Sequence, residues 1–425
     1  MRRLSVGATI ALYGAGLAVF VGIVAMRGGP SVEDAFGVTR PTTAIADGHL
    51  AEAARLEVLP QPPGYALLAS PFVLGLRPLI GSPTWCDAQV APVTRRFLSW
   101  CAPDQLATHR WYRSQAVLGL LAWLVLAVGA ARLLRGAGAG GGAEAFAVLV
   151  LATMPAASDG IVQTFHPQDL VCVGLCCAGL GEALRRRWVL TGVLFGLALL
   201  CKQFAVLPLI AVVAAAPGWR RRTRILGPVL AVAGAGILPF AVADPGATWN
   251  TLGAVNAAGV GRLTTGTVIG LTALPASAKL LVARDGPVVL AMAMALWARR
   301  RAGDDLLAPT ALIGLAASCL AGRLVVELWF ASYYLLAVST ALVLLDVAAR
   351  RPPVRSVAWI VGTGILVEQA GGLPTTTPAA YVAMVAALAA LAIGLRAVPR
   401  GARPRRGASA AAPARTPAPV PADPR

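Results

Sequence analysis

The chain has 425 residues, of which 57% are hydrophobic and only 13% are charged, and its mean hydropathy is +0.71. This composition excludes an ordinary soluble domain and favours an all-α polytopic membrane protein. The net charge of +18 would also suit a nucleic-acid-binding protein. The arginines, however, lie in short clusters between apolar runs, which is the pattern that sets membrane topology, so nucleic acid is not expected as a partner.

Two arginines, Arg2 and Arg3, precede the first apolar segment at about residues 4–26. Positive flanks stay on the cytoplasmic side, so the N-terminus is expected inside. No small-residue cleavage site follows this segment, and we interpret it as a retained first helix rather than a signal peptide. Residues 27–114 are then expected to form a large first extracytoplasmic loop.

Beyond this loop, apolar segments alternate with arginine clusters on one side and polar loops on the other. The alternation predicts about 12 spans, within a range of about 10 to 13, with both termini in the cytoplasm. Residues 1–395 are expected to form one membrane domain, and residues 396–425 a disordered basic tail rich in Ala and Pro. The further spans are expected at about residues 115–134, 143–157, 170–184, 188–218 (crossing twice), 225–243, 286–297, 306–320, 335–347, 356–370 and 378–395.

The segment 188–218 contains Lys202, one of only two lysines in the chain, amid apolar sequence. Arginine clusters bracket this segment on both sides, so it crosses the membrane twice or not at all. Two arms of about 15 residues would each be roughly 22 Å long, shorter than the roughly 30 Å hydrocarbon core. Lys202 and Gln203 are therefore expected at the tip of a short hairpin, in a sunken extracytoplasmic site. Lys202 either binds a lipid phosphate there or merely extends to the interface.

The first outer loop is too long for a simple connector. Asp47 and His49 begin a helical pattern, the turn PPGY follows at residues 62–65, and an apolar amphipathic stretch continues to about residue 80. Such a stretch is expected to lie on the membrane as an interfacial helix. Most acids of this loop suit a solvated surface, whereas Asp47 and Asp34 are the two candidates for a catalytic base.

A second outer element reads TFHPQDL and contains His166 and Asp169, spaced i, i+3. A helix that begins at Pro167 would bring the two side chains close together. Asp169 could instead complement the dipole of that helix, although this leaves the histidine unexplained. Two such residues are a weak signal for a metal, and no metal ligand is assigned.

A third outer element, GRLVVELWFASYYLL, begins with Gly322 and contains Arg323, Tyr333 and Tyr334. Arg323 and Glu327, spaced i, i+4, could simply pair. The aromatic residues could form a membrane-interface belt, or they could stack on a sugar.

The seven cysteines divide between apolar segments and the first loop. Five of them lie in apolar spans, where a thiol behaves as a small hydrophobic group. Cys86 and Cys101 lie in the outer loop about 15 residues apart, and an oxidising compartment favours a disulfide between them.

Taken in order, these motifs resemble the membrane glycosyltransferases of the GT-C superfamily, especially the actinobacterial branch near glycosyltransferase family 87. The resemblance covers roughly residues 1–395. In that group an acid precedes a PPGY turn, and an HPED-like motif opens a later span. A GLA…K motif and a late W…YYL motif follow. Here Gln168 stands where the group has an acid, and the adjacent pair Glu33-Asp34 precedes the proline turn.

The resemblance implies an inverting hexosyltransferase that moves mannose, or a similar sugar, from a polyprenyl-phosphate donor to a cell-envelope lipid or glycan acceptor. The reaction would take place on the extracytoplasmic side of the plasma membrane. Asp47 or Asp34 would act as the base on the acceptor hydroxyl. The residues expected to bind the substrate or its lipid phosphate are Lys202, Gln203, His166, Asp169, His49, Tyr65, Arg323, Tyr333 and Tyr334.

Two other functions compete with this one. A lipid or glycan flippase or transporter would have polar residues at the membrane midplane and two repeated halves, and the sequence shows neither. A non-catalytic envelope-assembly protein that keeps the GT-C fold is the other alternative, and Gln168 keeps it open.

Overall fold

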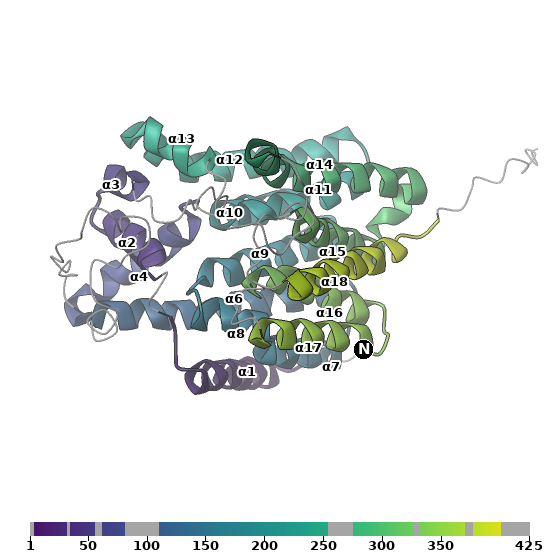
Figure 1. Ribbon diagram of the computed structural model, residues 1–425, viewed down its shortest axis with the longest axis horizontal. Helices are drawn as coiled ribbons and strands as arrows, with labels where there is room; N and C mark the ends of the chain where they lie inside the picture. Colours follow the sequence, from purple (N-terminus) through teal and green to yellow (C-terminus); the bar gives the residue numbers. More distant parts are fainter. Residues whose placement is uncertain are drawn as a thin grey trace, which may run out of the picture.

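The computed structural model describes residues 4–31, 35–55, 62–80, 110–253, 275–326, 332–369 and 377–400. Over these residues the fold consists of helices and connectors, without a β-strand. Most of the long helices run along the longest axis of the molecule (Figure 1). Helices α2, α3 and α4 gather at one end of this bundle, and the N-terminus lies near the other end.

A helix covers each segment that the sequence predicts to span. These helices are α1 (Val6–Met26), α6 (Arg110–Gly136), α7 (Gly141–Thr153), α9 (Pro167–Leu184), α10 (Trp188–Cys201), α11 (Val206–Ala215), α12 (Trp219–Ala243), α14 (Ala276–Ala302), α15 (Pro309–Val326), α16 (Leu335–Ala348), α17 (Val354–Gln369) and α18 (Thr377–Arg396). The other elements are α2 (Ala35–Ala46), α3 (Leu50–Arg55), α4 (Gly64–Ile80), α8 (Pro155–Val162), α13 (Pro245–Gly253) and the 3₁₀ turns η2 (Gln203–Ala205), η4 (Gly303–Leu307) and η5 (Ser332–Tyr334).

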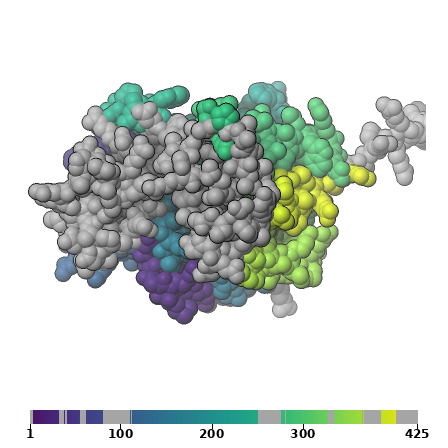
Figure 2. Space-filling model, viewed as in Figure 1, coloured from purple at the N-terminus to yellow at the C-terminus, as the bar shows by residue number. Residues whose placement is uncertain are grey.

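Among the described residues, five helices are long and apolar enough to cross a membrane. They correspond to α1, α6, α12, α14 and α15, and α7 with α8, bent by 41°, raises the number to six if the pair forms one span. α1 lies at the molecular surface (Figure 2), and its exposed apolar side chains suit contact with lipid. The chain is therefore a multi-pass membrane protein. The count of 12 spans and the cytoplasmic termini stay predictions, because α10 and α11, with 14 and 10 residues, are each too short to cross alone.

Close packing of α6 on α9 forms the centre of the bundle. A Cβ atom on Gly129 of α6 would lie only 1.9 Å from the carbonyl oxygen of Gly174 on α9. A Cβ atom on Gly181 would likewise lie 2.7 Å from the carbonyl oxygen of Arg132. The two backbones touch because these positions carry no side chain.

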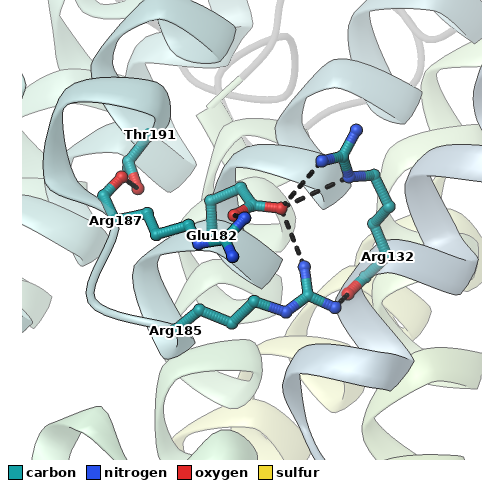
Figure 3. A network of polar contacts seen from close by, with 5 residues as sticks. All are labelled: Arg132, Glu182, Arg185, Arg187 and Thr191. Carbon is teal, nitrogen blue, oxygen red and sulfur yellow. Dashed lines mark hydrogen bonds and ion pairs between the residues drawn. The ribbon is translucent and has the colours of Figure 1, made fainter.

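One end of the bundle carries the arginine clusters and is called the arginine end below. Here Glu182, whose side chain is fully buried at the end of α9, accepts hydrogen bonds from Arg132 of α6 at 3.1 Å and from Arg185 at 2.7 Å (Figure 3). Arg187 lies 3.6 Å from the same carboxylate. Nearby, Arg135 pairs with Glu144 and joins α6 to α7. Buried carboxylates thus fasten the helix ends to one another.

The described part of the first outer loop is mostly helical. α4 packs against α2 and against the last turn of α10, since a Cβ atom on Gly64 would lie 2.5 Å from Leu200. One face of α4 is buried through Ala69 and Val73, and the other side exposes Leu68 and Leu79. This two-faced helix agrees with the predicted amphipathic stretch, and its position on a membrane surface stays a prediction. Cys86 and Cys101, with the predicted disulfide, lie outside the described residues, as does the tail from residue 401.

Candidate functional site

The helix α10 ends at Cys201, where the backbone of Lys202 becomes extended with φ −154° and ψ 138°. A single 3₁₀ turn, η2, separates this residue from α11. α10 begins at the arginine end and runs away from it. The start of α12 lies beside the start of α10, so α12 also begins at the arginine end. Because α12 follows directly after α11, α11 must bring the chain back to that end. A Cβ atom on Gly192 of α10 would touch the Ile225 carbonyl of α12. The structure therefore places Lys202 at the tip of a short helical hairpin, as the arginine pattern predicts.

Lys202 forms an ion pair with Asp169 in the first turn of α9. The Lys202 Nζ atom lies 3.4 Å from Asp169 Oδ2, and the two side chains are 17% and 6% exposed. Asp169 also interacts electrostatically with Arg323 near the end of α15. One buried carboxylate therefore interacts with two cations from different helices.

His166 occupies the N-cap position of α9 without a capping hydrogen bond from its side chain, and it is almost completely buried. Its Nδ1–H group donates a 2.9 Å hydrogen bond to the carbonyl oxygen of Thr164. Burial lowers the pKa of His166 well below its usual range, and the positive charge of Lys202 lowers this pKa further. The ring is therefore neutral, and because Nδ1 carries the proton, Nε2 is the hydrogen-bond acceptor. Such a ring suits a sugar hydroxyl better than a phosphate.

Three aromatic rings complete the group. The Tyr333 ring stacks on His166 with centroids 4.4 Å apart, and Tyr334 meets Tyr333 edge-on at 4.8 Å. The Arg323 guanidinium lies 4.6 Å from the centroid of Tyr334 and 5.2 Å from that of Phe204 in η2. These cation–π contacts hold Arg323 between the lysine hairpin and η5. Sequence analysis did not single out Phe204, although it lies two residues after Lys202.

Three of the outer motifs thus meet in one place, which we call the lysine–aspartate cluster. Their members come from the start of α9, the α10–α11 hairpin, the end of α15 and η5. Gln203 lies at the same hairpin tip and is exposed. Glu327 and Trp329, with the predicted Arg323–Glu327 pair, lie outside the described residues. The members of the cluster are His166, Asp169, Lys202, Phe204, Arg323, Tyr333 and Tyr334.

The first loop supplies Tyr65 to the edge of this cluster. Tyr65 is buried in the first turn of α4, and burial together with the nearby Cys201 thiol raises its pKa. Cys201 directly precedes Lys202 in the chain. Within the described part of the chain, the structure records no hydrogen-bond partner for the Tyr65 hydroxyl. A buried hydroxyl at this position has a donor to offer to a ligand.

The candidate acids of the first loop have different surroundings. Asp47 follows α2 and forms an ion pair with Arg77 of α4, a residue that sequence analysis did not single out. His49 lies 3.7 Å from Glu52, and both side chains are exposed. Asp34 lies outside the described residues. The observed contact gives Asp47 at least a structural role, which is to fasten the α2–α3 connector to α4.

A second buried acid, Asp159 in α8, was also missed. Arg27, which directly follows α1, forms an ion pair with Asp159 and donates a 3.0 Å hydrogen bond to Ser158. The next residue, Gly160, accepts a 2.5 Å hydrogen bond from the backbone N–H of His166. A Cβ atom on Gly160 would lie 3.5 Å from Tyr333. An acid within an apolar run just after Pro155 was the available sequence signal.

Among the described residues, no group of three or more His, Cys, Asp or Glu side chains is arranged to hold a metal ion.

Comparisons with known proteins find similarity among solved structures. No family profile matches the chain, and no curated protein matches it. Among solved structures, the oligosaccharyltransferase of Archaeoglobus fulgidus in its apo form is similar with a TM-score of 0.45 and 14% identity. The alignment covers 93% of this chain and 56% of that one, so this chain spans little more than half the length of that protein. A TM-score of this size does not establish a shared fold.

Proposed function

We propose that this chain is a GT-C-like membrane glycosyltransferase, as the resemblance of its motifs implies. It would transfer mannose or a similar hexose from a polyprenyl-phosphate donor to a lipid or glycan acceptor of the cell envelope. The site would face the extracytoplasmic side of the plasma membrane, at the end of the bundle opposite the arginine clusters.

The observation that carries this proposal is the lysine–aspartate cluster itself. Lys202, at the tip of a hairpin too short to cross the membrane, forms an ion pair with Asp169, and Arg323 also interacts with this carboxylate. Two cationic side chains in one cluster suit a phosphate that lies just inside the membrane surface, which is where the headgroup of a lipid donor lies. A flippase, by comparison, would need charged groups along a path through the bilayer.

The remaining residues of the cluster suit the sugar rather than the phosphate. Neutral His166 has Nε2 as an acceptor for a sugar hydroxyl, and Tyr334, which is partly exposed beside the buried Tyr333, has an aromatic ring for contact with a pyranose. In the reaction, the C1–O bond to the donor phosphate breaks as the acceptor oxygen attacks C1 from the opposite face. Lys202 and Arg323 would stabilise the charge that develops on the leaving phosphate. The base that takes the acceptor proton would be Asp47 or Asp34.

The proposal is tested with purified protein and labelled polyprenyl-phosphate mannose in the presence of envelope lipids. Release of polyprenyl phosphate, together with label in a lipid or glycan product, is the expected result. Movement of intact donor across proteoliposomes without cleavage would instead identify a flippase. Neither cleavage nor movement, from protein that binds the donor, would favour the non-catalytic alternative.

A further inference from the structure

The arginine end of α10 and α12 has more positive charge than any neighbouring acid compensates. The three arginines 185–187 precede α10, and Arg220, Arg221, Arg222 and Arg224 lie in the first turns of α12. Glu182 is the last acid before these arginines, and the next acid along the chain is Asp244, at the far end of α12. From residue 182 to residue 243 the chain thus has seven arginines in these two groups and a single acid, Glu182.

The two arginine groups belong to adjacent helix N-termini. α10 and α12 run parallel, because Gly192 packs on Ile225, Gly196 on Val229 and Leu200 on Gly236, with both numbers rising together. Their first turns therefore lie side by side. Parallel helices that start together also align the positive ends of their dipoles, which adds to the positive potential of the arginine side chains.

Glu182 neutralises only part of this charge. Its fully buried carboxylate holds Arg132, Arg185 and Arg187, so three guanidinium groups share one negative charge (Figure 3). Arg185 is further engaged by the carbonyl oxygen of Arg132 at 3.1 Å. Arg187 remains 64% exposed and Arg132 42% exposed. These two guanidinium groups can donate hydrogen bonds outward while Glu182 keeps them in position.

The α12 arginines are freer still. Arg222 donates to the carbonyl oxygen of Ala216 at 3.3 Å. For Arg220, Arg221 and Arg224, the described residues contain no carboxylate in ion-pair contact. Directly beside them, Trp219 is 69% exposed at the first position of α12, a position where tryptophan marks the headgroup layer of a membrane.

The neighbouring surface of α12 is apolar and uncovered. Beyond the arginines, Leu230, Leu238 and Val242 are strongly exposed along this helix. The surface thus combines a cationic end at headgroup depth with an apolar strip that leads from it into the hydrocarbon layer. A soluble phosphate compound or a nucleic acid would use only the first of these features.

We propose that the arginine ends of α10 and α12 bind the phosphate headgroup of an anionic phospholipid, whose acyl chains lie along the exposed face of α12. The guanidinium groups of Arg187, Arg220, Arg221 and Arg224 bind the phosphate oxygens. This site is separate from the lysine–aspartate cluster, which lies at the other end of α10, and it does not depend on the proposed transferase activity.

Native mass spectrometry of the detergent-purified full chain tests this site. Phosphatidylglycerol should be retained and phosphatidylcholine should not. The variant Arg220→Gln/Arg221→Gln/Arg224→Gln should bind phosphatidylglycerol on the order of 100-fold more weakly. The matched control Arg299→Gln/Arg300→Gln/Arg301→Gln removes the same charge from the end of α14, and it should change binding no more than about threefold.

A second measurement uses the unmodified protein, so the test survives if the triple variant does not fold. Raising the ionic strength from about 0.1 to about 1 M should release phosphatidylglycerol, because screening weakens the contacts of exposed charges. Equal loss of binding in the two triple variants would overturn the proposal. The proposal would also fail if phosphatidylcholine were retained as well as phosphatidylglycerol, or if high salt did not release phosphatidylglycerol. Complete displacement of phosphatidylglycerol by millimolar inorganic phosphate would contradict it too, because it would show a site for soluble anions.

Discussion

Replacing Lys202 with Met removes the ammonium group and keeps most of the apolar stem. Lys202 Nζ lies 3.4 Å from Asp169 Oδ2, and both side chains are largely buried. At an effective dielectric constant of about 20, two unit charges at this distance attract by about 5 kcal/mol. Desolvation offsets part of this attraction, and Arg323 still compensates Asp169 after the change. We therefore expect Lys202→Met to cost about 3 kcal/mol of stability, the lower end for a broken buried pair.

The loss of stability must be separated from the loss of donor binding. Lys202→Met leaves the buried Asp169 carboxylate without its ammonium partner, and Asp169→Asn removes that carboxylate. The double variant Lys202→Met/Asp169→Asn should therefore recover most of the unfolding midpoint that Lys202→Met loses. Binding of labelled polyprenyl-phosphate mannose should stay at least about 30-fold weaker in both variants, because the phosphate has lost its cation. Lys202→Arg should keep part of this binding, since it keeps the charge and changes its geometry.

The assay compares thermal unfolding in detergent with donor binding for each variant. Lys279→Met is the matched control, because Lys279 is the other lysine of the chain and lies in the first turn of α14. It should leave donor binding unchanged within about twofold. Wild-type donor binding by the double variant would refute the reasoning, and it would show that Lys202 serves only to neutralise Asp169.

Three further predictions concern the base, a histidine and the topology. Asp47→Asn should lower turnover at least about 100-fold. If Arg77→Gln, which breaks the same ion pair, lowers turnover and the unfolding midpoint as much as Asp47→Asn does, then Asp47 only holds α4 in place. Burial lowers the pKa of His166 in the folded protein. Above about pH 6.5 this imidazole is neutral in both the folded and the unfolded chain, and its contribution to stability is fully present. As the pH falls below this value, the unfolded chain binds the proton more readily, and stability is lost by up to about 1.4 kcal/mol per pH unit. His166→Asn should therefore flatten the decline of the unfolding midpoint between about pH 6.5 and pH 5, whereas His49→Asn should leave the decline in place. Reporter fusions at the arginine clusters should all indicate the cytoplasm, and a periplasmic signal at any of them would contradict the topology. The fusion sites are Arg135, Arg187, Arg224, Arg301 and Arg351.

Sequence alone determined the features that depend on local composition. Runs of apolar residues between arginine clusters identified a helical membrane protein and placed a helix at each expected span. The same pattern located the break at Lys202, because two arginine clusters on one side of a membrane require the intervening chain to turn back. Hydrophobicity and charge act on each segment separately, so a single sequence is enough to infer them.

Only the tertiary structure decided which of these segments meet. His166 and Tyr333 are far apart in the chain, and their rings stack because α8, which precedes His166, packs beside η5. The partners of Asp47 and Asp159, Arg77 and Arg27, likewise come from other helices and have no periodic signal. Ion pairs and ring contacts between helices depend on which faces pack together. That choice follows from the shapes of all the helices at once, such as the glycine contacts of α6 with α9, rather than from the spacing of residues along any one of them.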